Sequence, residues 1–338
     1  MKRLAVALAC LVLPSTALAQ ETRPLGQNLE RFDYGAPVHW FETEAQGQAV
    51  RMAWLDFAPQ GQARGETLVL LHGKNFCAAT WVETAEALAA QGWRVIVPDQ
   101  VGFCKSSKPT GFQYSFAQLA SLTRDLLQQA GVERPVLIGH STGGMLALHH
   151  ALLFPNAVER LVLVNPLGLN DPIAQGAPYA PLQTLLEEEA VTDAASIRAY
   201  QQRVYYGGDW SPDYQRWVDM LAGQYATDGG TAVRQAQARL SDMIQTQPTA
   251  HRLEQVKVPV TLIIGQEDLT AFRGNTAPEG VQIATVPQAA EAAVERFPDA
   301  ELVPLEGLGH SPMVQDPAVF QQMLVEVLKA GGKTSRPE

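Results

Sequence analysis

A serine in the pentapeptide Gly-His-Ser-Thr-Gly is the residue of this chain best placed for nucleophilic chemistry. The pentapeptide follows a short apolar run at 136–138, typical of a buried strand, and opens a helical pattern at 142–153. A sharp turn from strand to helix needs very small residues two positions before and after the nucleophile, so that the two elements do not collide. Gly139 and Gly143 meet this requirement. We therefore predict that Ser141 is a nucleophile presented to a cleft.

A serine hydroxyl is a weak nucleophile and needs a base that is oriented by an acid. His310 lies in the loop Gly-Leu-Gly-His-Ser-Pro, between the last expected strand at 301–305 and the last expected helix at 318–330. A loop at the carboxyl edge of the sheet can bring a base to Ser141, so we predict that His310 is this base. The other six histidines have less suitable positions: His39, His72, His140, His149, His150 and His251.

The acid is expected at the carboxyl end of the preceding strand. The apolar run 260–264 leads into Gly-Gln-Glu-Asp, where Asp268 is the better candidate and Glu267 is the alternative. A rival position after the strand at 161–164 holds Asn165, which cannot stabilise an imidazolium. The resulting chain order is serine, aspartate, histidine.

Acyl chemistry also needs two backbone N–H groups that stabilise the oxyanion. Thr142 follows the nucleophile and can supply one, and Lys74 can supply the other from the loop His-Gly-Lys-Asn-Phe after the expected strand 67–71. The Lys74 side chain can attract a substrate carboxylate, or it can be solvated or paired with a nearby acid. The residues expected to line a substrate pocket are Asn75, Phe76, Tyr206, Trp210 and Trp217.

The elements that must position these residues alternate between strand and helix. This alternation predicts βαβ units and a largely parallel sheet. Strands are expected at 38–43, 50–57, 67–71, 95–97, 136–138, 161–164, 260–264 and 301–305, and helices at 80–90, 116–130, 142–153 and 318–330. The alternation stops between 166 and 255, where helical spacing and many aromatic residues occur without a strand pattern. We interpret this segment as a helical insertion over the carboxyl edge of the sheet.

The N-terminus has the pattern of a signal peptide. Lys2 and Arg3 precede an apolar run at 4–13 that is too short to span a bilayer, and Ala-Leu-Ala at 17–19 resembles a cleavage site. We therefore predict that residues 1–19 are removed and that the protein is exported, either to a periplasm or to the medium. No stable membrane anchor is expected after cleavage.

Composition and charge exclude some partner classes. With 46% hydrophobic and 18% charged residues among 338, the chain resembles an ordinary globular protein. Loss of Lys2 and Arg3 with the leader changes the formal net charge from −10 to about −12. A negative chain without basic runs is a poor match for nucleic acid or for an anionic membrane.

Together, these motifs resemble the α/β-hydrolase superfamily, in the branch that carries a cap domain. The resemblance covers about residues 35–330. It rests on His72-Gly73, Asp99–Phe103 with Ser106, Gly139–Gly143, Asp268 and Gly309-His310. It implies an eight-stranded, mostly parallel sheet flanked by helices, a cleft between core and cap, and no cofactor. The expected domains are a core at 20–165 and 256–330, a helical cap at 166–255 after the sixth strand, and a disordered tail at 331–338.

The departures from family patterns narrow the expected activity. Related epoxide hydrolases and dehalogenases use an aspartate nucleophile, whereas position 141 is serine. Related iminopeptidases have a glycine-proline oxyanion loop, whereas the corresponding loop here reads Lys74-Asn75-Phe76. The resemblance therefore implies a serine hydrolase that cleaves carboxylic esters of small to medium size. Carbon–carbon bond hydrolysis or perhydrolysis on the same triad is one alternative. A non-catalytic ligand-binding protein with the same fold is the other.

Two cysteines remain after the predicted leader is removed. Cys77 and Cys104 follow strands that are neighbours in this fold, and an oxidising compartment favours disulfide formation. We therefore predict a disulfide between them, with two free buried thiols as the alternative. No metal site is expected from the sequence.

Overall fold

The computed structural model describes residues 22–228 and 230–331. The predicted signal peptide lies outside these residues, as does the predicted tail except for Gly331. Both therefore stay predictions. Within the two described ranges, no helix combines the length and the apolar character that crossing a bilayer requires.

An eight-stranded sheet forms the centre of the fold, in the order β1-β2-β4-β3-β5-β6-β7-β8. The strands are β1 (His39–Ala45), β2 (Gln48–Phe57), β3 (Thr67–Leu71), β4 (Arg94–Pro98), β5 (Val136–His140), β6 (Arg160–Val164), β7 (Val260–Gly265) and β8 (Ala300–Leu305). Strand β2 pairs antiparallel with β1 and β4, and the remaining pairs are parallel. The prediction of a mostly parallel, eight-stranded sheet is confirmed.

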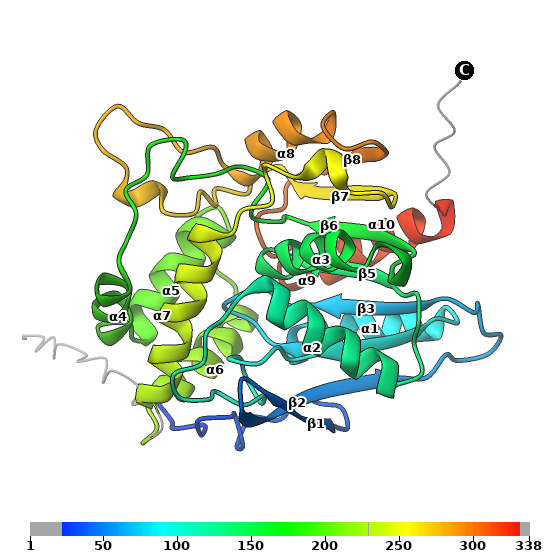
Figure 1. Ribbon diagram of the computed structural model, residues 1–338, viewed down its shortest axis with the longest axis horizontal. Coiled ribbons are helices and arrows are strands. Elements are labelled where there is room, and N and C mark those ends of the chain that lie inside the picture. The colour runs from blue at the N-terminus through cyan, green and yellow to red at the C-terminus, as the bar shows by residue number, and fades with distance from the viewer. Residues whose placement is uncertain (1–21, 229, 332–338) are drawn as a thin grey trace, which may run out of the picture.

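Helices cover both faces of the sheet (Figure 1), which explains why its central strands are continuous apolar runs. Helices α2 and α3 lie on the face toward the viewer, and α1 and α10 lie behind the sheet. These helices are α1 (Val82–Ala90), α2 (Phe116–Gln129), α3 (Thr142–Leu153) and α10 (Pro317–Ala330). Local signals set their ends. For example, the Asp316 side chain caps α10 by accepting from the backbone N–H of Val319 at 3.0 Å.

Among the described residues, four α-helices follow β6 and precede β7, as the sequence pattern predicts. They are α4 (Leu182–Ala190), α5 (Ala194–Tyr200), α6 (Gln215–Tyr225) and α7 (Gly230–Thr246), and a single π-helical turn, Gln201–Tyr205, continues from α5. We call these helices and their connecting loops the cap. Figure 1 shows the cap at the end of the sheet to which the arrows of β3 and β7 point. The exact domain bounds at 166 and 255 stay a prediction.

The structure contains two short helices that the sequence pattern did not predict. Helix α8 (Val286–Val294) packs beside β7 and β8, and α9 (Pro312–Gln315) lies between β8 and α10. Helix α8 begins with a capping box, in which the backbone N–H of Thr285 donates to Oε1 of Gln288 at 2.9 Å. Its buried residues, Val286, Ala289, Ala290 and Ala293, follow helical spacing, although most of them have small side chains.

A buried histidine near the end of α3 makes stability depend on pH. His150 packs edge-on against Phe154, with ring centroids 5.2 Å apart. Burial, and then the nearby charge of Arg124, lowers the pKa of His150 from 6.5 to about 4. Between these two pH values the unfolded chain binds a proton that the folded chain does not, so stability falls as the pH drops through this window.

We predict that His150→Leu weakens this pH dependence. The fall in Tm between pH 7 and pH 4.5, measured by thermal denaturation, should be smaller than in the wild type by about 2–4 °C. His39→Leu, at an exposed position, serves as the control and should retain the wild-type fall. Equal falls in all three proteins would contradict the assignment to His150.

Candidate active site

Ser141 stands on a strained turn between β5 and α3. Its backbone has φ +54° and ψ −117°, a combination that residues with a side chain rarely adopt. The two glycines of the pentapeptide permit this turn. A Cβ atom on Gly143 would lie 2.2 Å from the carbonyl oxygen of Leu71, and one on Gly139 would lie 2.4 Å from that of Gly143. The geometry is the strand–turn–helix arrangement that the motif predicts.

In the structure, hydrogen bonds join the side chains of the three candidate residues in one buried row. Nε2 of His310 lies 3.0 Å from Oγ of Ser141, and Nδ1 of His310 lies 2.7 Å from Oδ2 of Asp268. A carboxylate oxygen only accepts, so Nδ1 carries the proton and Nε2 directs its lone pair at the hydroxyl. Asp268 is held in turn by the backbone N–H of Thr270, at 2.8 Å. Glu267, the alternative acid, is exposed.

The backbone of His310 is fixed by residues whose role the motifs do not reveal. Nδ2 of Asn165 donates to the carbonyl oxygens of Gly309 and His310 at 2.8 and 2.9 Å, and its Oδ1 accepts from the backbone N–H of Gly265 at 2.7 Å. Asn165 therefore joins the ends of β6 and β7 to the His310 loop. Asn165 has a left-handed backbone, with φ +43°, which asparagine tolerates, but this tolerance does not reveal the anchoring role in the sequence.

Two further histidines support the site as neutral hydrogen-bonding groups. Nε2 of His140 donates to the carbonyl oxygen of His310 at 2.8 Å. His72 donates from Nδ1 to the carbonyl oxygen of Gly73 at 2.9 Å and accepts the backbone N–H of Gln100 on Nε2 at 3.2 Å. Burial holds the pKa of His140 well below the usual value and also lowers that of His72.

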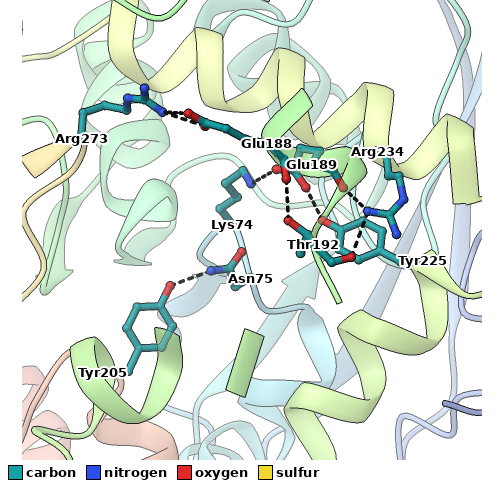
Figure 2. Close-up of polar contacts among 9 residues, drawn as sticks. All are labelled: Lys74, Asn75, Glu188, Glu189, Thr192, Tyr205, Tyr225, Arg234 and Arg273. Atoms are coloured by element: carbon teal, nitrogen blue, oxygen red, sulfur yellow. Dashed lines mark hydrogen bonds and ion pairs between the residues drawn. The ribbon is translucent and has the colours of Figure 1, made fainter. Parts of the chain in front are cut away.

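The loop with the second predicted oxyanion donor lies directly against the nucleophile. A Cβ atom on Gly73 would lie 3.0 Å from Cβ of Ser141. Among the hydrogen bonds of the described residues, the backbone N–H groups of Lys74 and Thr142 have no protein acceptor. Both groups are therefore free to stabilise an oxyanion, and their role stays a prediction. The Lys74 side chain is paired with Glu189 at 2.9 Å (Figure 2), which was one of the expected alternatives.

A cavity of about 410 Å³ lies between this loop and the cap. Of the five expected pocket residues, Asn75 borders it, whereas Phe76, Tyr206, Trp210 and Trp217 do not. These aromatic side chains pack instead: Tyr206, for example, stacks on Tyr214 with ring centroids 4.0 Å apart. The residues that border the cavity and were not predicted include Glu189, Tyr200, Gln201, Phe272 and Arg273.

The π-helical turn of the cap covers the candidate base. The ring of Tyr205 lies 4.6 Å from that of His310, and the Tyr205 carbonyl oxygen accepts the His310 backbone N–H at 3.0 Å. Nδ2 of Asn75 donates to the Tyr205 hydroxyl at 2.8 Å. The cap therefore meets the loop 72–76, which we call the oxyanion loop, at the hydrogen bond between Asn75 and Tyr205 (Figure 2).

The predicted disulfide is wrong in this structure, where Cys77 and Cys104 are free and buried. Each thiol has another acceptor. The Cys77 thiol contacts Sδ of Met220 at 3.1 Å, and the Cys104 thiol donates to the carbonyl oxygen of Phe76 at 3.2 Å. Burial raises the pKa of the Cys104 thiol, so this group stays protonated.

Asp99 completes the only candidate metal-ligand cluster found among the described residues. A carboxylate oxygen of Asp99 and the sulfurs of Cys77 and Cys104 lie within 4.8 Å of one another. The carboxylate already accepts from the Tyr34 hydroxyl at 2.6 Å and from the backbone N–H groups of Ala78 and Lys105 at 2.7 and 3.0 Å. Asp99 thus ties together the two loops that follow β3 and β4.

A family model described as alpha/beta hydrolase fold matches residues 66–316. The chain belongs to the α/β-hydrolase family. The resemblance inferred from the motifs is therefore confirmed, and hydrolase chemistry on a small molecule follows from the family.

Relatives of this α/β-hydrolase are found among both structures and sequences. The crystal structure of a "probable hydrolytic enzyme" from Pseudomonas aeruginosa PAO1 shares 47% identity and a TM-score of 0.89, over 91% of this chain and 99% of that one. An uncharacterized protein of Mycobacterium tuberculosis (strain ATCC 25618 / H37Rv) is 30% identical over 76% of this chain and 73% of its own length. Lipase 1 of Psychrobacter immobilis is 25% identical over 77% of this chain and 75% of the lipase.

We predict that Asn165→Ala destabilises this α/β-hydrolase. The substitution leaves the backbone N–H of Gly265 without its partner and releases the carbonyl groups of Gly309 and His310. The free energy of unfolding should fall by about 2–4 kcal/mol in urea denaturation. Asn170→Ala is the matched control, because Asn170 makes one solvent-accessible hydrogen bond, to Gln175. A similar loss in both variants would contradict the proposed support of the His310 loop.

Proposed function

We propose that this α/β-hydrolase cleaves carboxylic esters through an acyl-enzyme formed on Ser141. The observation that carries the proposal is the buried line of hydrogen bonds from Ser141 to His310 and Asp268, at 3.0 and 2.7 Å. Such a line activates a hydroxyl that is otherwise a poor nucleophile. The retention of all three groups in this geometry argues against the alternative of a non-catalytic binding protein.

In the proposed reaction, Nε2 of His310 takes the Ser141 proton as Oγ attacks the ester carbonyl carbon. Asp268 holds the imidazole in the required tautomer and stabilises its positive charge. The backbone N–H groups of Thr142 and Lys74 stabilise the oxyanion. His310 then protonates the leaving alcohol, and in the second half-reaction it activates a water molecule that releases the acid and regenerates Ser141.

The size of the cavity and one relative support an ester of small to medium size. The cavity is bordered by Lys74 and Asn75 of the loop beside Ser141, although neither Ser141 nor His310 borders it, and its volume of about 410 Å³ is near the lower end of the range of small-molecule sites. The relative from Psychrobacter immobilis is named as a lipase, an enzyme class that hydrolyses esters. Carbon–carbon bond hydrolysis and perhydrolysis use the same triad, and a substrate panel separates them from ester hydrolysis.

We predict that Ser141→Ala abolishes hydrolysis of p-nitrophenyl esters. With substrates from acetate to decanoate, kcat should fall by about 10⁴-fold or more, because the acyl-enzyme cannot form. A fluorophosphonate should label the wild type at Ser141, as checked by mass spectrometry of peptides. Labelling without hydrolysis of any ester would retain the nucleophile and reject ester specificity, and failure of both would favour the binding-protein alternative.

We predict that Asp268→Asn lowers kcat by about 10⁴-fold, because an amide in this position favours the wrong imidazole tautomer. The adjacent Glu267→Gln makes the same chemical change at an exposed position and should leave kcat within about twofold. Steady-state kinetics on one p-nitrophenyl ester is sufficient to compare the two variants. A larger loss in Glu267→Gln would assign the acid to Glu267.

A further inference from the structure

The walls of the cavity between the core and the cap are unusually polar for a site that accepts acyl chains. Lys74 and Asn75 border it from the oxyanion loop, and Arg273 borders it from the loop after β7. The cap contributes Glu188 and Glu189, at the end of α4. Apolar side chains such as Ile197, Leu221 and Phe272 form only part of the lining.

The charged groups of these walls neutralise one another. Nζ of Lys74 lies 2.9 Å from Oε1 of Glu189, and Nη1 of Arg273 donates to both carboxylate oxygens of Glu188 at 2.8 and 3.0 Å (Figure 2). The other oxygen of Glu189 accepts from the Tyr225 hydroxyl at 2.7 Å. Two cations facing two carboxylates present no net formal charge, so neither an anionic nor a cationic ligand gains from entering.

Gln201 lies beside this cavity with its hydrogen-bonding capacity unused. The residue is 0% exposed, and neither Nε2 nor Oε1 has a hydrogen-bond partner among the described residues. Nε of Arg273, also buried and also at this cavity, has none either. Buried polar groups in native proteins normally find a partner. Both groups therefore have unused hydrogen-bonding capacity in the wall of the cavity, where neighbouring atoms cover them in this structure.

The position of Gln201 connects it to the candidate base. Gln201 begins the single π-helical turn and Tyr205 ends it, and the turn is closed by the hydrogen bond from the backbone N–H of Tyr206 to the carbonyl oxygen of Gln201 at 3.2 Å. Isolated π-turns inside α-helices frequently occur at functional sites. This turn places Gln201 at the cavity while Tyr205 lies against the ring of His310.

From these observations we propose that Gln201 binds an uncharged hydroxyl or carboxamide group of the ester substrate, at a distance from the bond that is cleaved. A hydroxyl or carboxamide group both donates and accepts hydrogen bonds, as the Gln201 amide does. The oxygen atom of such a ligand group can also accept a hydrogen bond from Nε of Arg273. A carboxylate would face Glu188 and Glu189, and an ammonium group would face Lys74 and Arg273. The inference rests on the proposed ester hydrolysis and specifies its substrate class as short, neutral, polar esters.

The test compares pairs of ethyl esters that differ in one group. Ethyl succinamate is paired with ethyl 4-methylpentanoate, and ethyl 3-hydroxybutanoate with ethyl 3-methylbutanoate; monoethyl succinate is the anionic member. Values of kcat/KM from pH-stat titration are divided by the hydroxide rate constants, which removes intrinsic reactivity. For the wild type we expect at least one neutral polar ester to exceed its apolar partner by about tenfold or more. A preference for both apolar partners, or for monoethyl succinate, would overturn the proposal.

Two variants assign the preference to the side chain. Gln201→Met keeps the side-chain length and removes the amide, so the polar-to-apolar ratio of kcat/KM should fall by roughly tenfold to hundredfold. Gln202→Met makes the same change in the same turn, but Gln202 does not border the cavity and bonds instead to the carbonyl oxygen of Gly208. This control should keep the wild-type ratio. An unchanged ratio in Gln201→Met would mean that the amide holds a buried water only, and would overturn the proposal.

The outcome is separable from the test of ester hydrolysis itself. Fluorophosphonate labelling of Ser141 and hydrolysis of p-nitrophenyl acetate are measured on the same wild-type preparation. If both succeed and the polar preference is missing, only the role of Gln201 is rejected. If both fail, the proposed function is rejected first. Should Gln201→Met fail to fold, as shown by circular dichroism, the ratio measured on the wild type still decides whether the polar substrate class is correct.

Discussion

The close packing of the Ser141 turn against the end of β3 is the constraint on which the site depends. The carbonyl oxygen of Leu71 occupies the space that any side chain at Gly143 would need, and a Cβ atom on Gly73 would lie 3.0 Å from Cβ of Ser141. This packing brings the nucleophile, the first N–H of α3 and the oxyanion loop to one place without a flexible side chain between them. The strained backbone of Ser141 is kept because β5 is a central strand of the sheet and α3 packs against β3, β5 and β6.

The candidate base is held mainly through its backbone. The carbonyl oxygen of His310 accepts from Asn165 and from His140, and its N–H donates to Tyr205. The hydrogen bonds of the His310 ring therefore go only to Asp268 and Ser141. Neutral His140 suits this role, since a second cation beside His310 would oppose the positive charge that the proposed mechanism places there.

The sheet and the line of three residues could be predicted because local patterns determine them. Parallel strands end at one edge, so Ser141, Asp268 and His310, each placed just after a strand, are expected to meet there. The role proposed for Gln201 and the contacts of Asn165 depend on which distant groups surround these residues, and no local pattern carries that information. The same reason explains the disulfide error: the two cysteines are neighbours, as expected, but their thiols also contact Met220 and Phe76, which the sequence does not reveal.

The hydrogen bond from His310 to the carbonyl group of Tyr205 has a consequence for protein engineering. Here the cap completes the hydrogen bonding of the loop that carries the base, so a transplanted cap must reproduce one carbonyl group at that point in space. Directed evolution of selectivity in this scaffold can therefore vary the side chains of the cap, Gln201 included, provided that the backbone carbonyl group of Tyr205 keeps its position.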